Sequence, residues 1–323
     1  MSVTTTKQLT RAFGLDEIAL VPSSLTLDPE LVDPSTNIAN IQLDVPIFAS
    51  AMDSVVNPKT AGLIGKLGGA GILNLEGVQT RYENPEDVLN QISSVTKSEY
   101  VTLMQDIYQK EPIKDHLIKQ RIKEIKDQGV QPVVSSTPQK ASRLGPLAAE
   151  NGAEAFLVQS TVVSTRFKSA HHEKNLNLEE FCSEMTIPVM VGNSTTTDVT
   201  LSLMRTGVKG VFIGIGPGAA CTTRGVLAIG VPMATAILNA VEARNIHLEE
   251  TGIYVPIIAD GGIVNSGDVC KSLACGADAV MIGSPLAKAI EAPGNGYHWG
   301  MATPNAVLPR GSRIEVGTIG SLK

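Results

Sequence analysis

The chain has 323 residues and a net charge of −6. This length accommodates one large domain or two ordinary ones, and the acidic balance argues against non-specific binding to nucleic acid or to anionic membranes. The four cysteines form no disulfide framework and no CxxC pair, and the chain shows neither a signal peptide nor the roughly 18-residue apolar run of a membrane span. We therefore expect a cytoplasmic protein.

Short apolar segments rich in β-branched residues alternate with longer amphipathic segments along the chain. The expected strands are residues 45–49, 70–73, 130–135, 155–158, 188–191, 210–213, 255–259 and 279–282. The expected helices between them are residues 57–67, 86–95, 113–128, 141–151, 178–185, 199–206, 233–244 and 266–275. Several of these helices are followed by a glycine, as a left-handed helix end requires, at Gly68, Gly129, Gly152, Gly207 and Gly276.

The alternation of near-continuous apolar strands with helices indicates a parallel sheet covered by helices. Eight such units favour a single-domain (β/α)8 TIM barrel, with an open doubly wound sheet as the alternative. We assign residues 1–40 to an N-terminal arm that leads into the barrel, and residues 41–323 to the barrel itself.

A glycine-rich stretch, GIGPGAACTTR at residues 214–224, follows the sixth expected strand. It therefore lies at a strand's C-terminal end, where α/β enzymes place their chemistry. Closely spaced glycines let backbone groups converge on a ligand, and Cys221 is a candidate attacking thiolate. A buried cysteine beside a tight turn is the alternative.

Two further loops indicate a nucleotide site. Asp260 stands before Gly261 and Gly262 after the seventh strand, and Gly283 and Ser284 follow the eighth. A carboxylate can accept two hydrogen bonds from a ribose diol, while glycines and a helix N-terminus admit a phosphate. Each motif alone also suits an ordinary turn or helix entry, but together they favour phosphate binding.

Seven motifs, in order, resemble the IMP dehydrogenase and GMP reductase family. They are FGLDEIALVP (13–22), ASAMDSV (49–55), VGN (191–193), GIGPGAACTTR (214–224), ADGGI (259–263), MIGS (281–284) and EAPG (291–294). The resemblance implies a (β/α)8 fold, a homotetramer or octamer, a purine nucleotide 5′-monophosphate as the small-molecule partner, and NAD as cofactor.

The resemblance also implies roles for individual residues. The expected catalytic residues are Cys221 as the nucleophile on purine C2, Thr223 and Glu291 as the proton-handling pair, and Arg313 as the water activator, with Arg310 less favoured. The expected substrate contacts are Ser50, Met52, Gly218, Asp260, Gly262, Gly283, Ser284, His298, Gly300 and Met301. Ser160 and Asn193 match dinucleotide contacts, and a potassium ion would bind backbone carbonyls of Gly216, Gly218 and Cys221.

Two reactions share this machinery. A dehydrogenase oxidises IMP to XMP with NAD through a covalent thioimidate on Cys221, in guanine nucleotide biosynthesis; a reductase converts GMP to IMP with NADPH. Val231 favours the dehydrogenase, because reductases favour Tyr there, and residues 74–130 leave no room for an inserted CBS pair. The chain thus most resembles the CBS-less IMP-dehydrogenase-related branch, and a catalytically inactive nucleotide-binding barrel is a further alternative.

Three features depart from the family pattern. Ala219 stands where the family has a serine that donates to the phosphate, a contact that His298 would replace. The fourth strand ends in LVQS (157–160) rather than in an Asp-containing turn, which leaves the choice between NAD and NADP open. The chain stops at Lys323, shortly after a flap-like segment near residues 300–320, so we expect a truncated C-terminal part.

Overall fold

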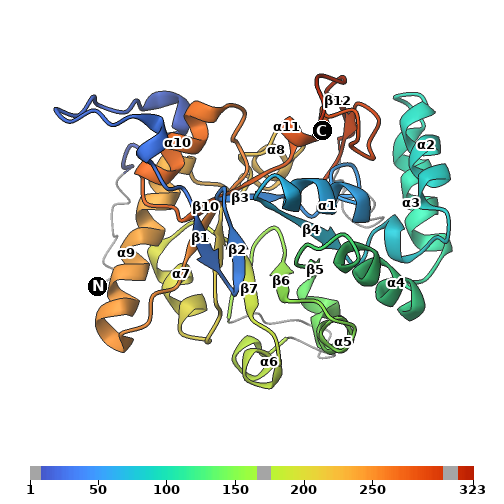
Figure 1. The fold of residues 1–323 in the computed structure, drawn as a ribbon, viewed down its shortest axis with the longest axis horizontal. Helices are drawn as coiled ribbons and strands as arrows, with labels where there is room; N and C mark the ends of the chain where they lie inside the picture. Colours follow the sequence, from blue (N-terminus) through green and yellow to red (C-terminus); the bar gives the residue numbers. More distant parts are fainter. Residues whose placement is uncertain (1–8, 166–175, 301–311) are drawn as a thin grey trace, which may run out of the picture.

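The computed structural model describes residues 9–165, 176–300 and 312–323. Its centre is a closed parallel barrel of eight strands surrounded by helices (Figure 1). The strands are β3 (Ile47–Ala49), β4 (Ala70–Asn74), β5 (Val133–Ser136), β6 (Ala155–Gln159), β7 (Val189–Ser194), β8 (Val211–Ile213), β9 (Ile257–Asp260) and β10 (Ala279–Ile282). Strand β10 pairs with β3 in parallel and closes the ring, which confirms the predicted (β/α)8 barrel and excludes the open sheet.

All eight predicted helices form. The helices are α1 (Pro58–Lys66), α2 (Pro85–Ser94), α3 (Tyr100–Lys110), α4 (Asp115–Lys126), α5 (Pro138–Glu150), α6 (Leu178–Glu184), α7 (Thr197–Met204), α8 (Thr223–Leu227), α9 (Met233–Thr251), α10 (Ser266–Ala274) and α11 (Ser284–Ala287), with short 3-10 turns at Leu15–Glu17, Pro29–Leu31 and Val78–Thr80. The described residues thus contain three more helices, α3, α8 and α11, that the sequence did not predict. All five glycines predicted to end helices have positive φ, between 78° and 107°. Among the described residues, no helix has the length and apolarity that crossing a bilayer needs.

A two-stranded hairpin covers one end of the barrel. It consists of β1 (Thr36–Ile38) and β2 (Ile41–Leu43), and the predicted boundary between arm and barrel falls at its turn. The turn residues Ala39 and Asn40 both have positive φ, but they lack the Asn-Gly signature that marks such turns in a sequence, so the hairpin was not predicted. Its buried apolar residues join the inward-facing core of the strands. The opposite, C-terminal rim is therefore the end left for chemistry.

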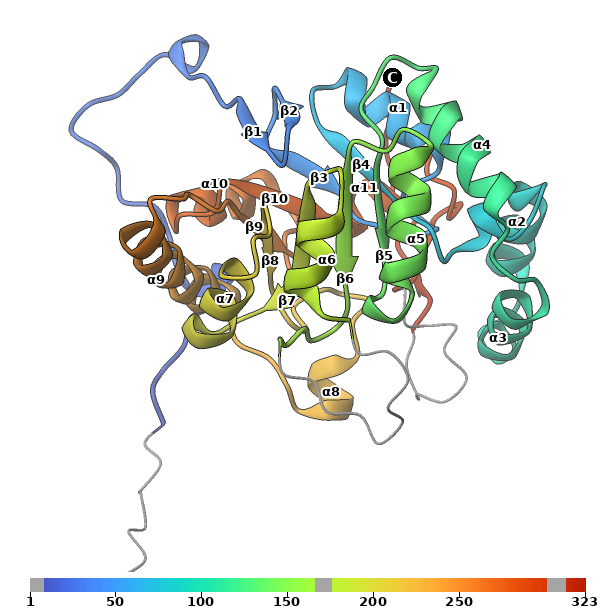
Figure 2. The same cartoon turned by 90° about the horizontal axis from the view of Figure 1, so that it is seen from below.

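A second apolar cluster lies beside the barrel, under α2 and α3, which stand at one side of the molecule in Figure 2. Trp299 is fully buried in this cluster, just after the strand β11 (Tyr297–His298). Strand β11 pairs antiparallel with β12 (Ile314–Glu315). The two helices therefore anchor the segment that follows the eighth barrel unit.

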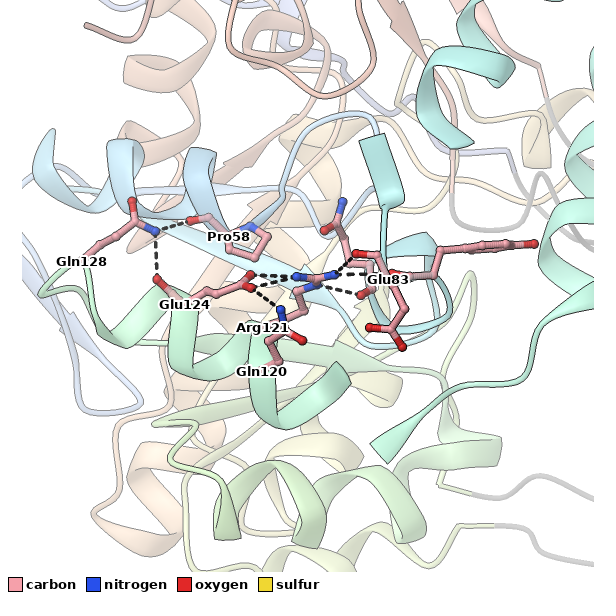
Figure 3. Close-up of polar contacts among 8 residues, drawn as sticks. Pro58, Glu83, Gln120, Arg121, Glu124 and Gln128 are labelled. Carbon is pink, nitrogen blue, oxygen red and sulfur yellow. Dashed lines mark hydrogen bonds and ion pairs between the residues drawn. The ribbon is translucent and has the colours of Figure 1, made fainter. Parts of the chain in front are cut away.

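The loop after β4 is held by a buried arginine on α4 (Figure 3). Arg121 donates from Nε to the carbonyl of Gln79 at 3.0 Å and from Nη2 to the carbonyl of Glu83 at 3.1 Å. Its Nη1 also pairs with Glu124 Oε1 at 2.8 Å. This guanidinium satisfies carbonyls that the turn cannot pair internally, and so ties the entrance of α2 to the outer helix layer.

Candidate active site

The cysteine predicted as nucleophile lies on the loop between β8 and α8, and its side chain is exposed. Its thiol donates to the hydroxyl of Thr223 with a Sγ to Oγ1 distance of 3.2 Å. Thr223 is buried as the first residue of α8, so its hydroxyl is held in place while the sulfur remains accessible. The structure thus brings together two of the four predicted catalytic residues, and it does not place Cys221 in the core.

Close approaches require glycines both in this loop and in the turn after β9 that faces it. Gly214 has φ of 136°, and a Cβ there would lie 2.2 Å from the carbonyl oxygen of Asp260. Gly262 has φ of 73°, and its Cβ would lie 3.0 Å from Pro217 Cβ. The loop that bears the cysteine therefore packs directly against the Asp260-Gly261-Gly262 turn, and larger residues would separate them.

Asp260 ends β9 and is held by two amides, from Gln159 at the end of β6 and from Asn193 in β7. Its Oδ2 accepts from Asn193 Nδ2 at 2.7 Å and from Gln159 Nε2 at 3.0 Å. Burial raises the pKa of Asp260 to about 6, and the two hydrogen bonds oppose that rise because they stabilise the ionised form. At neutral pH the group is mainly a carboxylate, which can accept hydrogen bonds from a diol.

The residues expected to bind a phosphate lie where β3 and β10 adjoin. The backbone N–H of Ser50 donates to the carbonyl of Ile282 at 3.0 Å, and Ser284 begins the short helix α11. A Cβ at Gly283 would lie 3.2 Å from Ser50 Oγ and 3.2 Å from His298 Cε1, so this position admits no side chain without displacing one of them. Ser50, Gly283 and His298 therefore lie together, although they come from widely separated parts of the chain.

The imidazole of His298 is neutral at physiological pH. Burial lowers the pKa of His298 to about 4, because no water remains to solvate the imidazolium. Its Nδ1 lies 3.2 Å from Ser54 Oγ, which also accepts from the backbone N–H of Trp299 at 3.4 Å. In the tautomer in which the Ser54 hydroxyl donates to Nδ1, the ring proton lies on Nε2, the nitrogen beside Gly283.

Some residues predicted to bind the cofactor or the cation already make hydrogen bonds within the protein. The Ser160 hydroxyl donates to the carbonyl of Val162 at 2.8 Å, and Asn193 Nδ2 donates to the carbonyl of Gly214 at 2.9 Å as well as to Asp260. The carbonyl of Gly218, proposed as a potassium ligand, accepts from the backbone N–H of Cys221 at 3.0 Å. A carbonyl retains a second lone pair, so this bond is compatible with a cation.

Glu291 makes its hydrogen bonds away from the Cys221 loop. Its carboxylate accepts from the Ser321 hydroxyl and from the backbone N–H of Leu322, and these bonds hold the pKa of Glu291 below its ordinary value. The described structure thus shows Glu291 bound to the end of the chain rather than hydrogen-bonded to Thr223.

Arg313 is likewise engaged elsewhere. Its guanidinium donates to the carbonyls of Ile92 and of Val95 at the end of α2, and it stacks on the ring of Tyr297 at 4.3 Å. Its neighbour Ser312 does reach the loop that carries Cys221, donating to the carbonyl of Ala220 at 3.3 Å.

The remaining predicted contacts are Met52, Gly216, Gly300 and Met301. Met52 is half-buried, and its backbone N–H donates to the carbonyl of Ser50 at 2.7 Å. Gly216 has φ of 79°, and open space lies where Gly300 would carry a Cβ. Met301 lies outside the described residues, as does Arg310.

Sequence reasoning did not assign Gln159 or Ser54 to the site. Gln159 is a candidate from its place at the end of the fourth strand, where the chain also departs from the family pattern, but without a role of its own, and Ser54 stands only within the ASAMDSV motif. The position of Gln159 at a strand's C-terminal end was the available signal for it, whereas the contact of Ser54 with His298 spans 244 residues and left no local mark.

Fold and rim together define the class: a (β/α)8-barrel enzyme with an accessible thiol beside a hydroxyl, a carboxylate and paired glycines at the strand ends. The chain belongs to the IMP dehydrogenase / GMP reductase family, whose domain model matches residues 12–303. It is an oxidoreductase of that family.

Relatives cover nearly all of the chain. An uncharacterized oxidoreductase of Mycolicibacterium smegmatis is 37% identical over 95% of this chain and 83% of its own length. The inosine-5′-monophosphate dehydrogenase of Cryptosporidium parvum is 35% identical over 90% of this chain and 71% of its own. A crystal structure of an IMP dehydrogenase/GMP reductase-like protein from Corynebacterium glutamicum matches with a TM-score of 0.89 and 33% identity, covering 98% of this chain and 84% of that one.

Proposed function

We propose that the protein oxidises IMP to XMP with NAD, through a covalent thioimidate on Cys221, as a step of guanine nucleotide biosynthesis. The observation that carries this proposal is the pair of Cys221 and Thr223 on a loop packed against Asp260. The similarity to an enzyme named inosine-5′-monophosphate dehydrogenase supports the choice of substrate.

In this reaction the sulfur of Cys221 adds to C2 of the hypoxanthine ring as a thiolate. The thiol proton leaves to water through the hydroxyl of Thr223, which accepts that proton along the existing hydrogen bond as it passes on its own. NAD, when bound, supplies the acceptor for the hydride that leaves C2. Water then hydrolyses the thioimidate and releases the thiol. The covalent step divides one difficult reaction into two easier ones.

Substrate binding would use both halves of the rim. Asp260 accepts from the ribose hydroxyls, and the phosphate is held at Gly283 and Ser284, with Gly218 and Gly262 admitting it closely. His298 would donate from Nε2 to that phosphate, in place of the hydroxyl that Ala219 lacks. A neutral donor suits this task, since it needs no charge that burial would penalise.

A second function is favoured by one specific observation. Glu291 and Arg313, two of the predicted catalytic residues, are bonded elsewhere. This engagement favours a barrel that binds the nucleotide without completing turnover. GMP reduction with NADPH is the other reaction of the family, so the test must distinguish it from IMP oxidation.

The test follows the absorbance of reduced cofactor with IMP and NAD, and separately with GMP and NADPH. Cofactor reduction with IMP that is lost in Cys221→Ala supports the proposal, whereas oxidation of NADPH with GMP overturns it. Nucleotide binding without either signal identifies the inactive barrel. Mass spectrometry of the quenched reaction would show the nucleotide adduct on Cys221, and adding or omitting potassium tests the cation.

We further propose that the protein is a cytoplasmic homotetramer or octamer. The described cysteines are all free, as a reducing compartment favours. The arm before the barrel carries widely exposed apolar side chains, with Val21 90% and Leu31 73% exposed, and Figure 2 shows this arm leaving the body of the molecule. A second copy that covers the arm would remove this apolar surface from water. Light scattering on a gel-filtration column measures the assembly directly.

A further inference from the structure

A hydrogen-bonded cluster connects three strand ends across the rim. Gln159 ends β6, Asn193 lies in β7 and Asp260 ends β9. Gln159 Nε2 donates to Asp260 Oδ2 at 3.0 Å and to Asn193 Oδ1 at 3.2 Å. One amide nitrogen thus reaches two side chains that the barrel brings together from 34 and 101 residues away.

Every amide N–H of the Gln159 and Asn193 side chains has a hydrogen-bond acceptor. Asn193 Nδ2 uses one N–H for the carbonyl of Gly214 and the other for Asp260 Oδ2. Gln159 uses both of its N–H groups, and its bond to Asn193 Oδ1 fixes which way the Asn193 amide faces. Both bonds to Asp260 converge on Oδ2, while Oδ1 receives no hydrogen bond from the described residues.

We propose that Gln159 is a positioning residue for ribose recognition: it fixes Asn193 and Asp260 Oδ2, and so leaves Asp260 Oδ1 oriented and ionised for the diol of a nucleotide. This inference rests on the proposed function, because it assumes that Asp260 meets a ribose. An amide fits the position better than an acid, since a second carboxylate at this distance would raise the pKa of Asp260.

The charge of Asp260 depends on these donors. Burial raises its pKa, the amides of Asn193 and Gln159 lower it, and no charged side chain of the described residues contributes. Other titratable groups on the strand-end segments include Asp53 after β3, Glu76 after β4, Cys221 on the β8–α8 loop and His298, whose pKa of about 4 lies below the range of interest. Removal of the Gln159 donor raises the pKa of Asp260 further, so more of the protein carries a protonated Asp260 near neutral pH.

The experiment uses Gln159→Met, which keeps a side chain of similar length without a donor. Calorimetric titration with IMP and with 2′-deoxy-IMP is carried out on the full-length assembly from about pH 5 to pH 8. Wild-type affinity for IMP is expected to fall as the pH drops through the pKa of Asp260, near 6. The variant is expected to bind IMP about tenfold more weakly at pH 7, to show a higher midpoint, and to lose much less affinity for the deoxy ligand.

The matched control is Val162→Ala, an exposed position on the same loop with no part in the cluster. An unchanged pH midpoint in Gln159→Met, or an equal loss for both ligands, would overturn the positioning role and indicate a general structural defect. A second readout needs no ligand: the carboxyl carbon of Asp260 is titrated by NMR in both proteins, with Asp260→Asn for assignment. A pKa that does not rise in Gln159→Met overturns the inference. If wild-type protein bound no IMP, the proposed function would fail separately.

Discussion

The sulfur of Cys221 and the hydroxyl oxygen of Thr223 lie 3.2 Å apart, with the sulfur exposed and the hydroxyl buried at the start of α8. The pair is local in sequence, but its environment is not, because the loop rests on the turn after β9. A buried hydroxyl that cannot rotate away is suited to proton transfer with the thiol.

Thr223→Val tests this pair. The substitution removes the hydroxyl with little change in shape, and we expect kcat with IMP and NAD to fall about 10²-fold, as for the loss of a proton-transfer partner. Thr222→Val is the matched control, since Thr222 makes no side-chain bond at the helix start. Equal effects of the two substitutions would contradict a specific role for Thr223.

A substitution at Gly214 tests how the loop that carries Cys221 packs against the turn after β9. A Cβ at this position would approach the carbonyl oxygen of Asp260 to 2.2 Å, at a φ of 136° that side chains rarely adopt. We expect Gly214→Ala to lower the free energy of unfolding by about 2–4 kcal/mol, from strain and overpacking together. Gly225→Ala, with no atom within 4 Å of the added Cβ, is expected to change stability by less than about 1 kcal/mol in urea denaturation.

The sequence predicts elements well where the signal is local, and misses contacts that only the closed barrel creates. Each strand shows in the sequence as a short apolar run rich in β-branched residues, and Gly129 or Gly276 alone marks the end of a helix. The bond between Gln159 and Asp260 depends instead on how strands 101 residues apart are placed around the ring. Motifs placed Asp260 at the rim, but they could not show which amides determine its ionisation.

The lowered pKa of His298 makes the free energy of unfolding depend on pH. Its pKa in the folded protein is about 4, below its ordinary value of 6.5, so the unfolded chain binds more protons between these values. Its contribution to stability is therefore complete above about pH 6.5 and is lost as the pH falls towards 4, to the order of 3 kcal/mol. His298→Gln should lack this component. The measurement is the difference in unfolding free energy between the two proteins at neutral and acidic pH; a constant difference would contradict a buried neutral imidazole.

Arg121 gives a prediction for the loop after β4. Arg121→Met removes the donors to Gln79 and Glu83 and leaves their carbonyls without these partners, so we expect a loss of about 3 kcal/mol in chemical denaturation. Arg143→Met breaks an exposed pair with Asp115 and should cost much less. Similar losses in both variants would mean that the carbonyls of Gln79 and Glu83 find other partners.

The sequence and the structure suggest different roles for Arg313, and a substitution can distinguish them. The resemblance predicts that it activates water, whereas the structure shows it bonded to the end of α2 and stacked on Tyr297. Arg313→Lys keeps the charge but loses the planar fork and the stacking. With an anchoring role, hydrogen exchange should speed up in β11, β12 and the end of α2, while hydrolysis of the Cys221 adduct keeps pace with its formation. With a water-activating role, the adduct accumulates and is seen by mass spectrometry of the quenched reaction. Because one outcome is read in ligand-free protein and the other during turnover, the same variant can show that Arg313 anchors the segment at rest and changes partners during catalysis.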